Sequence, residues 1–239
     1  MKVKRYQKKF DYSYAFGTYP VIDLLKYHKD SVIKVLKKSI TDDSEGVREV
    51  EALCNELGIR VEVADRAIEK IAFKENTYVV GVFEKYECEL DLDANHLVLV
   101  EPRNMGNVGT IIRTMLGFNY KNLVLVGNSA DIFDPKVVRS TMGAIFRVNF
   151  KYYETIQEYM SDFSNHSYYP FMLDGAKDIR TVEFKEPYSM IQGNESKGLD
   201  SEYMNIGQSV FIPHSDSIDS LNLSIATSLG IWEVSRRDS

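Results

Sequence analysis

Short apolar runs separated by polar turns fill the first third of the chain and predict a small α/β unit. The longest helix expected there carries one apolar face at helical spacing and ends at Gly58. The strands are short and rich in β-branched residues. The predicted elements, in chain order, are helix, strand, helix, strand, helix and strand over 20–28, 31–39, 44–58, 59–63, 65–72 and 77–84.

The apolar pattern changes in the second part of the chain. Residues 84–95 are acidic and polar without apolar periodicity, which is typical of a domain boundary. After them, five continuous apolar runs alternate with helical stretches, as expected for buried parallel strands covered by helices. The runs span 96–101, 122–127, 168–173, 188–193 and 208–213, and Asp134-Pro135 predicts a helix start. We therefore expect an α/β protein with a first domain over 1–90 and a parallel-sheet domain over 91–239.

Composition narrows the class of protein. The chain has 239 residues, of which 44% are hydrophobic, so a substantial core is available. No apolar run approaches the length of a membrane span, and the N-terminus lacks the apolar segment of a signal peptide. Cys54 and Cys88 make neither a disulfide framework nor a metal site. A reduced, cytoplasmic protein without a metal fits best.

Charge is unevenly distributed. The net charge of −6 argues weakly against a nucleic-acid partner, but five of the first ten residues are basic and none is acidic. This segment is either a solvated, frayed tail or a basic arm that binds a polyanion. The five are Lys2, Lys4, Arg5, Lys8 and Lys9.

The first cluster of candidate functional residues is "EPRNMGNVGTIIRTMLGF", 101–118. A strand ends, a Gly/Asn turn follows, and a helix begins that has a buried apolar side. Only Gly106-x-x-Gly109 is present where a dinucleotide site needs G-x-G-x-x-G, which disfavours that site. The polar side chains lie at the carboxyl edge of the strand, where open α/β sheets bind ligands. The candidates are Asn104, Asn107 and Arg113.

The second cluster is "MIQGNESKGLD", 190–200, a loop bracketed by Gly193 and Gly198. A phosphate loop would require Lys and Ser/Thr after the second glycine, where this chain has Leu199 and Asp200. Glu195 suits a cationic or hydroxyl-bearing ligand rather than an anion. The remaining alternative is an acidic surface turn.

The third cluster is "VFIPHSDSIDSLNLSIATSLGIWEVSRR", 210–237. A strand ends at Pro213, a polar loop follows, and a helix is expected to begin near Ser220. Ser220 and Asn222 are interpreted most simply as helix caps. The predicted core face of the helix consists of Leu221, Ile225, Leu229 and Trp232.

Taken together, "NMGNVGTIIRT", "GNESKGL" and "IPHSDSIDSLNLSIA" resemble the three ordered motifs of the SpoU-type (TrmH-like) RNA ribose methyltransferases of the SPOUT superfamily. The resemblance covers about 96–237, and residues 14–84 look like the family's N-terminal α/β substrate-binding domain. It implies a C-terminal trefoil-knotted domain, bent binding of S-adenosyl-L-methionine in the knotted crevice, and a homodimer with the active site at its interface.

The resemblance also assigns residues. Those matching the family's methyl-donor pocket are Leu173, Gly193, Asn194, Gly198, Ile212 and Leu221. Those matching its catalytic and substrate-positioning residues are Asn107, Arg113, Glu195, Ser220 and Asn222. Family proposals give Arg113 the proton of the ribose 2′-hydroxyl. A guanidinium releases its proton only above about pH 12, so binding of the flanking phosphate is the alternative role.

The resemblance leaves the RNA substrate open. His214 stands where the family usually has an apolar residue, and the loop around it is unusually acidic. We expect ribosomal RNA, with 23S favoured, because of the separate N-terminal module and the absence of a basic extension after the last helix. Phosphate contacts are expected on the basic arm and on Lys34, Lys37 and Lys38. The alternatives are a transfer-RNA 2′-O-methyltransferase, a base methyltransferase, or a catalytically silent RNA-binding or ribosome-assembly factor of the same fold.

Overall fold

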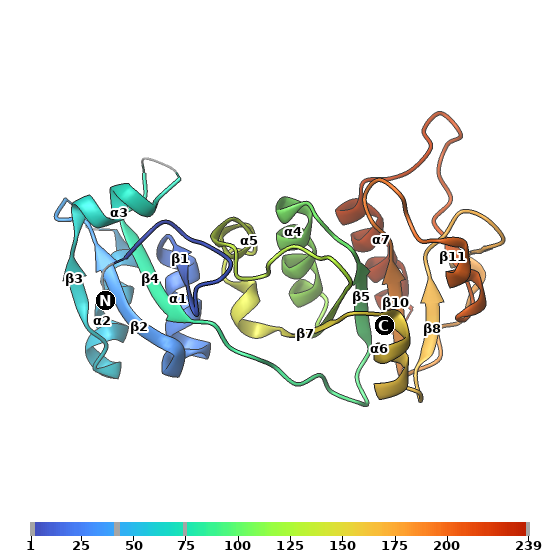
Figure 1. Ribbon diagram of the computed structural model, residues 1–239, viewed down its shortest axis with the longest axis horizontal. Coiled ribbons are helices and arrows are strands. Elements are labelled where there is room, and N and C mark those ends of the chain that lie inside the picture. Colours follow the sequence, from blue (N-terminus) through green and yellow to red (C-terminus); the bar gives the residue numbers. More distant parts are fainter. Residues whose placement is uncertain (1–2, 41–43, 74–75, 238–239) are drawn as a thin grey trace. The chain divides into compact units, whose positions relative to one another are not determined.

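The computed structural model describes residues 3–40, 44–73 and 76–237, and divides the chain into two compact units (Figure 1). The first unit comprises Met1–Tyr86 and Asp131–Arg147, and the second comprises Glu87–Ala130 and Val148–Ser239. The first break lies within the predicted boundary segment at 84–95. The sequence-based division at residue 90 did not assign 131–147 to the first unit.

The first unit is built on a four-stranded mixed sheet of order β1-β4-β2-β3. Strand β4 pairs antiparallel with β1 and β2, whereas β2 and β3 are parallel. The strands are β1 (Tyr12–Phe16), β2 (Val32–Lys37), β3 (Val61–Val63) and β4 (Val79–Glu84). The helices are α1 (Thr18–Tyr27), the 3₁₀ turn η1 (Lys29–Ser31), α2 (Glu45–Leu57) and α3 (Asp65–Ile71). The predicted elements of this unit are thus present, and β1 is a strand that the pattern analysis did not identify.

The basic arm is a packed segment rather than a frayed tail. Val3 is buried in the core cluster of the first unit, and the Tyr14 hydroxyl donates to the Lys4 carbonyl over 2.5 Å. Lys2 lies outside the described residues. Lys34 is ion-paired with Glu62 at 2.8 Å, and Lys37 is ion-paired with Glu51. These two pairs remove two of the cations from which phosphate contacts were expected.

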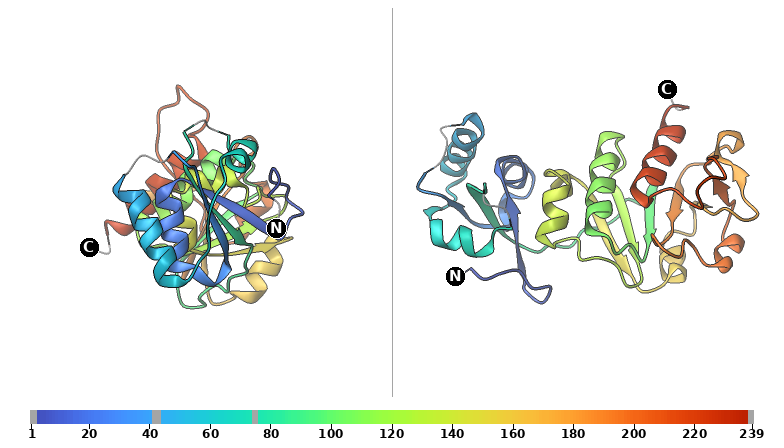
Figure 2. Two further views of the ribbon diagram at one scale, coloured as in Figure 1. Left: turned by 90° about the vertical axis from the view of Figure 1, so that its left-hand side faces the viewer. Right: turned by 90° about the horizontal axis from the view of Figure 1, so that it is seen from above.

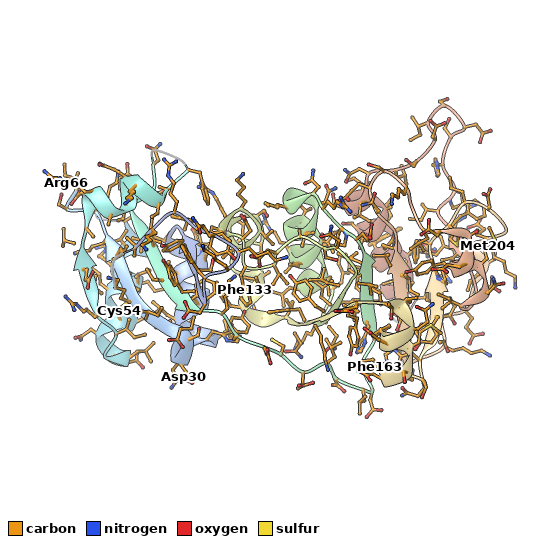
Figure 3. All side chains as sticks on the ribbon, in the orientation of Figure 1. Asp30, Cys54, Arg66, Phe133, Phe163 and Met204 are labelled. Carbon is orange, nitrogen blue, oxygen red and sulfur yellow. The ribbon has the colours of Figure 1, made fainter. Side chains whose placement is uncertain are left out.

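Residues 131–147 join the first unit through α5 (Pro135–Ser140) and the 3₁₀ turn η2 (Ala144–Arg147). Asp134 caps α5 by accepting from the amide of Lys136 at 2.8 Å, as its position before Pro135 predicts. The Ser13 hydroxyl on β1 donates to the carbonyl of Phe133, whose side chain is labelled in Figure 3. This segment therefore covers β1 and belongs to the core of the first unit.

The second unit holds a five-stranded, all-parallel sheet of order β7-β6-β5-β10-β8. Its strands are β5 (His96–Val100), β6 (Asn122–Val126), β7 (Asn149–Tyr153), β8 (Ser167–Pro170) and β10 (Tyr188–Gln192). Strands β9 (Lys177–Asp178) and β11 (Val210–Phe211) form a separate two-stranded sheet. The helical elements are α4 (Met105–Gly117), α6 (Ile156–Asp162), η3 (Ile179–Thr181), η4 (Ser201–Asn205) and α7 (Leu223–Ser235).

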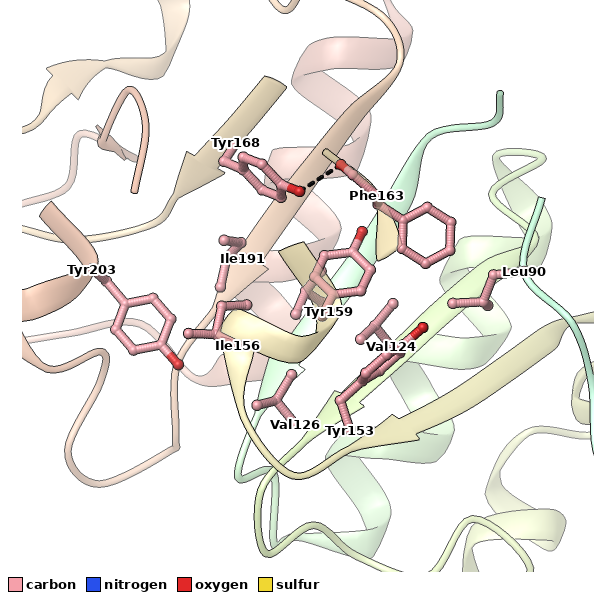
Figure 4. Packing of buried hydrophobic residues seen from close by; sticks show 11 residues of the cluster. Leu90, Val124, Val126, Tyr153, Ile156, Tyr159, Phe163, Tyr168, Ile191 and Tyr203 are labelled. Atoms are coloured by element: carbon pink, nitrogen blue, oxygen red, sulfur yellow. Dashed lines mark hydrogen bonds between the residues drawn. The ribbon is translucent and has the colours of Figure 1, made fainter. Parts of the chain in front are cut away.

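Helices cover both faces of this sheet (Figure 2). Helices α4 and α7 pack against each other on one face, and α6 lies on the other. Figure 4 shows the core on the α6 side, where Tyr159 and Phe163 meet apolar residues of β5, β6 and β10. Because the five strands are parallel, their carboxyl ends lie at one edge of the sheet. The candidate residues gather at this edge.

Two sequence-based expectations are corrected by the fold. The run 208–213 was expected to be a strand of the main sheet, but only Val210–Phe211 forms a strand, which pairs with β9, while Val210 also makes an isolated parallel bridge to Phe171 directly after β8. In α7, Ile225, Leu229 and Trp232 are 52%, 40% and 50% exposed in the single chain, so the predicted core face is wrong. The buried residues of α7 include Leu223, Thr227, Ile231 and Val234. Because α7 is apolar on both faces, periodicity could not identify the inner one.

None of the helices in the described ranges is long and apolar enough to cross a membrane. Cys54, labelled in Figure 3, is buried in the first unit and Cys88 is half-buried in the second, and both are free thiols.

Candidate functional site

A cavity of about 340 Å³ lies in the second unit, where the segment after β8, the loop after β10 and the segment before α7 come together. Its volume is within the range of small-molecule sites. The six predicted donor-pocket residues all line it: Leu173, Gly193, Asn194, Gly198, Ile212 and Leu221. Two of the predicted catalytic residues, Glu195 and Ser220, line it as well.

The loop 193–198 is closed by its own backbone. The Asn194 amide donates to the Gly198 carbonyl over 3.1 Å, and the Gly198 amide donates back over 2.9 Å. Gly198 has a φ of +70°, which favours glycine. A Cβ atom at Gly193 would lie 2.5 Å from the backbone nitrogen of Leu199 and closer still to Gly198, so no side chain fits there. The two glycines thus allow the tight closure that shapes this wall of the cavity.

The Asn194 side chain holds this loop in place. Its Oδ1 accepts from the amides of Ser196 and Lys197, at 2.9 and 3.3 Å. Its Nδ2 donates over 2.8 Å to the carbonyl of Glu101, directly after β5. Asn194 therefore ties the loop after β10 to the end of the neighbouring strand.

Glu195 connects this loop to the start of α4. Its carboxylate accepts from the amides of Asn104 and Arg103, at 3.0 and 3.2 Å, and from Asn107 Nδ2 at 3.3 Å. Burial raises the pKa of Glu195, but these hydrogen bonds outweigh it and hold the pKa below the ordinary value for Glu. The ionised carboxylate also lies at the positive end of the α4 dipole. An acidic residue in a glycine-bracketed loop is thus explained by a partner within the protein.

Asn222 continues the same chain of contacts. Its Nδ2 donates to Asn107 Oδ1 over 3.3 Å, while its Oδ1 accepts from the Ser224 amide at 2.9 Å and caps α7. The capping interpretation is confirmed for Asn222, whereas Ser220 lies two residues before the cap and does not cap the helix. The row Glu195–Asn107–Asn222 also joins the three sequence clusters in space.

The cap makes a measurable prediction. Asn222→Ala should lower the free energy of unfolding by about 1 kcal/mol, because the amides at the start of α7 lose their acceptor. Asn222→Ser should cost much less, since serine caps about as well, although it is too short to reach Asn107. Urea denaturation of the three proteins measures the difference. Equal losses in both variants would contradict the capping role.

Ser220 and His214 complete the loop side of the cavity. Ser220 is exposed and lines the opening, and His214 Nδ1 lies 2.8 Å from the Ile212 carbonyl. Because a carbonyl only accepts, Nδ1 is the donor of this hydrogen bond.

Arg113 is not brought to this row of contacts within one chain. It is exposed on α4 and, among the described residues, has no hydrogen bond or ion-pair partner. It follows Asn107 by six residues, so it lies about 9 Å further along the helix and on a different face. Of the five predicted catalytic residues, Glu195 and Ser220 line the cavity, Asn107 and Asn222 are joined to Glu195 by hydrogen bonds, and Arg113 lies apart.

The pattern analysis missed the inner end of the cavity. Phe171, Gln192, Val210, Leu223 and Ala226 line it, and four of these five are apolar residues that read simply as core. Gln192 is polar, but nothing in the sequence marks it as part of the cavity. Among the described residues, no group of three or more His, Cys, Asp or Glu side chains is placed to hold a metal ion.

A family model described as the SpoU rRNA Methylase family matches residues 94–232. This range holds the cavity, the first two sequence clusters and the third cluster as far as Trp232.

Curated relatives act on two kinds of RNA. One named 23S rRNA (uridine(2479)-2′-O)-methyltransferase, from Streptomyces viridochromogenes, is 29% identical over 66% of this chain and 60% of its own length. One named 23S rRNA (guanosine-2′-O-)-methyltransferase, from Acinetobacter baylyi, is 24% identical over 94% of this chain and 97% of its own. One named putative tRNA (cytidine(34)-2′-O)-methyltransferase, from Listeria innocua, is 29% identical over 61% of this chain and 89% of its own. The chain spans 60% and 53% of the length of the first two curated relatives it matches.

Among solved structures, an AdoMet-bound rRNA methyltransferase from Sinorhizobium meliloti superposes with a TM-score of 0.79 at 29% identity. The superposition covers 95% of this chain and 88% of that one. The α/β fold with a parallel sheet is therefore shared along nearly the whole chain.

Proposed function

Because the chain belongs to the SpoU rRNA Methylase family, we propose that it is an S-adenosylmethionine-dependent RNA methyltransferase that modifies a ribose 2′-hydroxyl. The observation that carries the proposal is the meeting of the second and third clusters at one cavity, with the first cluster joined to them through the row Glu195–Asn107–Asn222. A structural turn and a helix cap alone do not require this cavity.

The residues around the cavity fit S-adenosylmethionine. The inner end is apolar and suits a flat aromatic ring, while Glu195, Ser196 and Lys197 at the loop suit charged groups. Gly193 keeps the loop backbone close enough to line the site without a side chain in between. Leu173, Ile212 and Leu221 are assigned to the apolar walls, and Asn194 and Gly198 hold the loop that closes over them.

When bound, S-adenosylmethionine supplies a methyl group that is already electrophilic, so the chemistry left to the protein is positioning. Arg113 is assigned to bind the phosphate beside the target nucleotide and so to orient its 2′-hydroxyl. Ser220 and the amides of Asn107 and Asn222 are assigned to hold the ribose, because an amide can both donate and accept. Glu195 fixes the orientation of the Asn107 amide, because it accepts from Asn107 Nδ2 and from the backbone at the start of α4.

Ribosomal RNA is the proposed substrate class, with 23S rRNA preferred. Support comes from the 23S relative that aligns along 94% of this chain, including the first unit, whereas the tRNA relative aligns along 61%. The first unit is proposed to deliver the RNA through the exposed cations Lys4, Arg5, Lys8 and Lys9. A tRNA substrate and a silent assembly factor are the alternatives that the experiments below separate.

We also propose that the path from β10 to α7 is knotted. Support comes from the sheet order, in which β10 inserts between β5 and β8, and from the bond of Asn194 to the end of β5.

Donor binding tests the proposal without RNA. Isothermal titration calorimetry of the full chain should show one site per chain for S-adenosylmethionine and for its demethylated product. A folded protein that binds neither at millimolar ligand contradicts the methyltransferase proposal.

A second copy of the chain is the proposed cover for the exposed stripe of α7. Ile225, Leu229 and Trp232 recur at helical spacing and form an apolar strip that a monomer would leave in water. Light scattering at micromolar concentration should give twice the 27.4 kDa of one chain. Trp232→Glu should give monomers, whereas Leu92→Glu, at another exposed apolar residue, should not. A wild-type mass of one chain would contradict the dimer.

A further inference from the structure

Gln192 ends β10 at the inner end of the cavity, and its side-chain amide is incompletely bonded. The residue is 4% exposed. Its Nε2 is the one buried side-chain nitrogen or oxygen, among the residues that the structure describes, without a hydrogen-bond partner. Buried polar groups are almost always paired, so an orphaned amide beside a cavity points to a partner that the cavity receives.

The protein around Gln192 offers no acceptor. The backbone of Gly230 in α7 and the ring of Phe171 lie beside Gln192. A Cβ atom built on Gly230 would lie 3.8 Å from Gln192 Nε2 and 2.8 Å from the Phe171 ring. The first neighbour is helical backbone and the second is apolar. The carbonyls within α7 are already engaged in the helix. Turning the amide about its last bond exchanges its nitrogen and oxygen but creates no partner on this side.

The neighbours of Gln192 indicate which part of a ligand it meets. Phe171, Val210, Leu223 and Ala226 line the cavity beside it and are apolar, whereas the carboxylate and ammonium groups of the lining belong to Asp174, Glu195 and Lys197. An apolar slot with a single amide matches a flat heterocycle that carries a donor and an acceptor side by side. A carboxylate or an ammonium group would be left without a counter-charge there.

We propose that Gln192 reads the adenine edge of the methyl donor, accepting from the exocyclic amine and donating to a neighbouring ring nitrogen. A primary amide presents this donor–acceptor pair in the geometry with which Asn and Gln recognise adenine. The inference rests on the proposed function, because it takes the occupant of the cavity to be an adenosine-bearing donor. It adds a side chain that determines specificity to a pocket otherwise formed by loop backbone and apolar walls.

The test compares two ligands on two proteins by calorimetry. The ligands are S-adenosyl-L-homocysteine and its counterpart with unsubstituted purine in place of adenine, which lacks the exocyclic amine. Wild type should prefer the adenine ligand, and in Gln192→Met the ratio of the two affinities should fall by about five- to tenfold. The methionine keeps the length and burial of the side chain but cannot form hydrogen bonds with the base.

Thermal melting of the free proteins separates recognition from a structural role. Gln192→Met should melt at or above the wild-type temperature, because an unpaired polar group has been replaced by an apolar one. If this variant does not fold, Gln192→Leu, which is also apolar and cannot form hydrogen bonds with the base, provides the same ratio. An unchanged ratio, or a lowered melting temperature with unchanged preference, overturns the inference while leaving the methyltransferase proposal standing. A folded wild type that binds neither ligand overturns both.

Discussion

Arg113→Ala is expected to reduce methyl transfer at least about a hundredfold while changing donor affinity by no more than about twofold. Arg113 is exposed and, within the described part of the chain, has no hydrogen bond or ion pair, so its removal should not disturb the fold. The donor cavity is lined by the two later clusters and not by Arg113. The loss should therefore appear in turnover with RNA and not in calorimetry with the donor.

Lys121→Ala is the matched control for this variant. It also removes one exposed cation, but it lies beyond the carboxyl end of α4, at the opposite edge of the sheet. Its activity should remain within about twofold of wild type, as for most surface substitutions. A parallel loss of donor affinity and turnover in Arg113→Ala would show that the assigned role is wrong.

Gly193→Ala is expected to weaken donor binding by at least about a hundredfold. The new Cβ atom would overlap the backbone of Gly198 and Leu199, and neither a main-chain carbonyl nor an amide can swing aside as a long side chain does. The loop must open, which breaks the paired bonds between Asn194 and Gly198 and displaces Glu195 from the start of α4. Calorimetry with S-adenosylhomocysteine measures the loss.

Two other glycines give graded controls. Gly117→Ala adds a methyl group that meets nothing within 4 Å at the end of α4 and should bind the donor as wild type does. Gly198→Ala has room for its methyl group but must keep a φ of +70°, so a cost of about 1 kcal/mol and a moderate loss are expected. If Gly193→Ala binds as tightly as Gly117→Ala, the loop does not form the wall of the donor site.

Much of the fold followed from local pattern. The helix that ends at Gly58, the cap at Asp134 and the apolar runs at β5, β6 and β10 were predictable because each depends on neighbours in sequence. The assignment of 131–147 to the first unit was not, since it depends on Phe133 and Phe146 packing with residues far away in sequence. The exposed side of α7 was unpredictable for the same kind of reason, because the helix is apolar all round.

The sequence predicted which residues belong to the candidate site better than it predicted the contacts that these residues make. The family resemblance indicated Glu195 and six of the residues that line the cavity, but not that Glu195 accepts from the start of α4. Gln192 was missed because its importance lies in the lack of a partner, which only the packing around Phe171 and Gly230 reveals. Lys34 and Lys37 looked available for phosphate until their pairing across the first unit was seen.

The destination of the methyl group tests the central claim most directly. Tritium transfer from labelled S-adenosylmethionine should be followed onto protein-free ribosomal RNA and onto total tRNA, with alkaline hydrolysis of each product. A 2′-O-methyl group blocks cleavage at its own phosphate, so the account predicts label in ribosomal RNA that is recovered as an alkali-resistant dinucleotide. Label in mononucleotides would mean base methylation, label in tRNA alone would overturn the substrate class, and no transfer by a donor-binding protein would indicate the silent assembly factor.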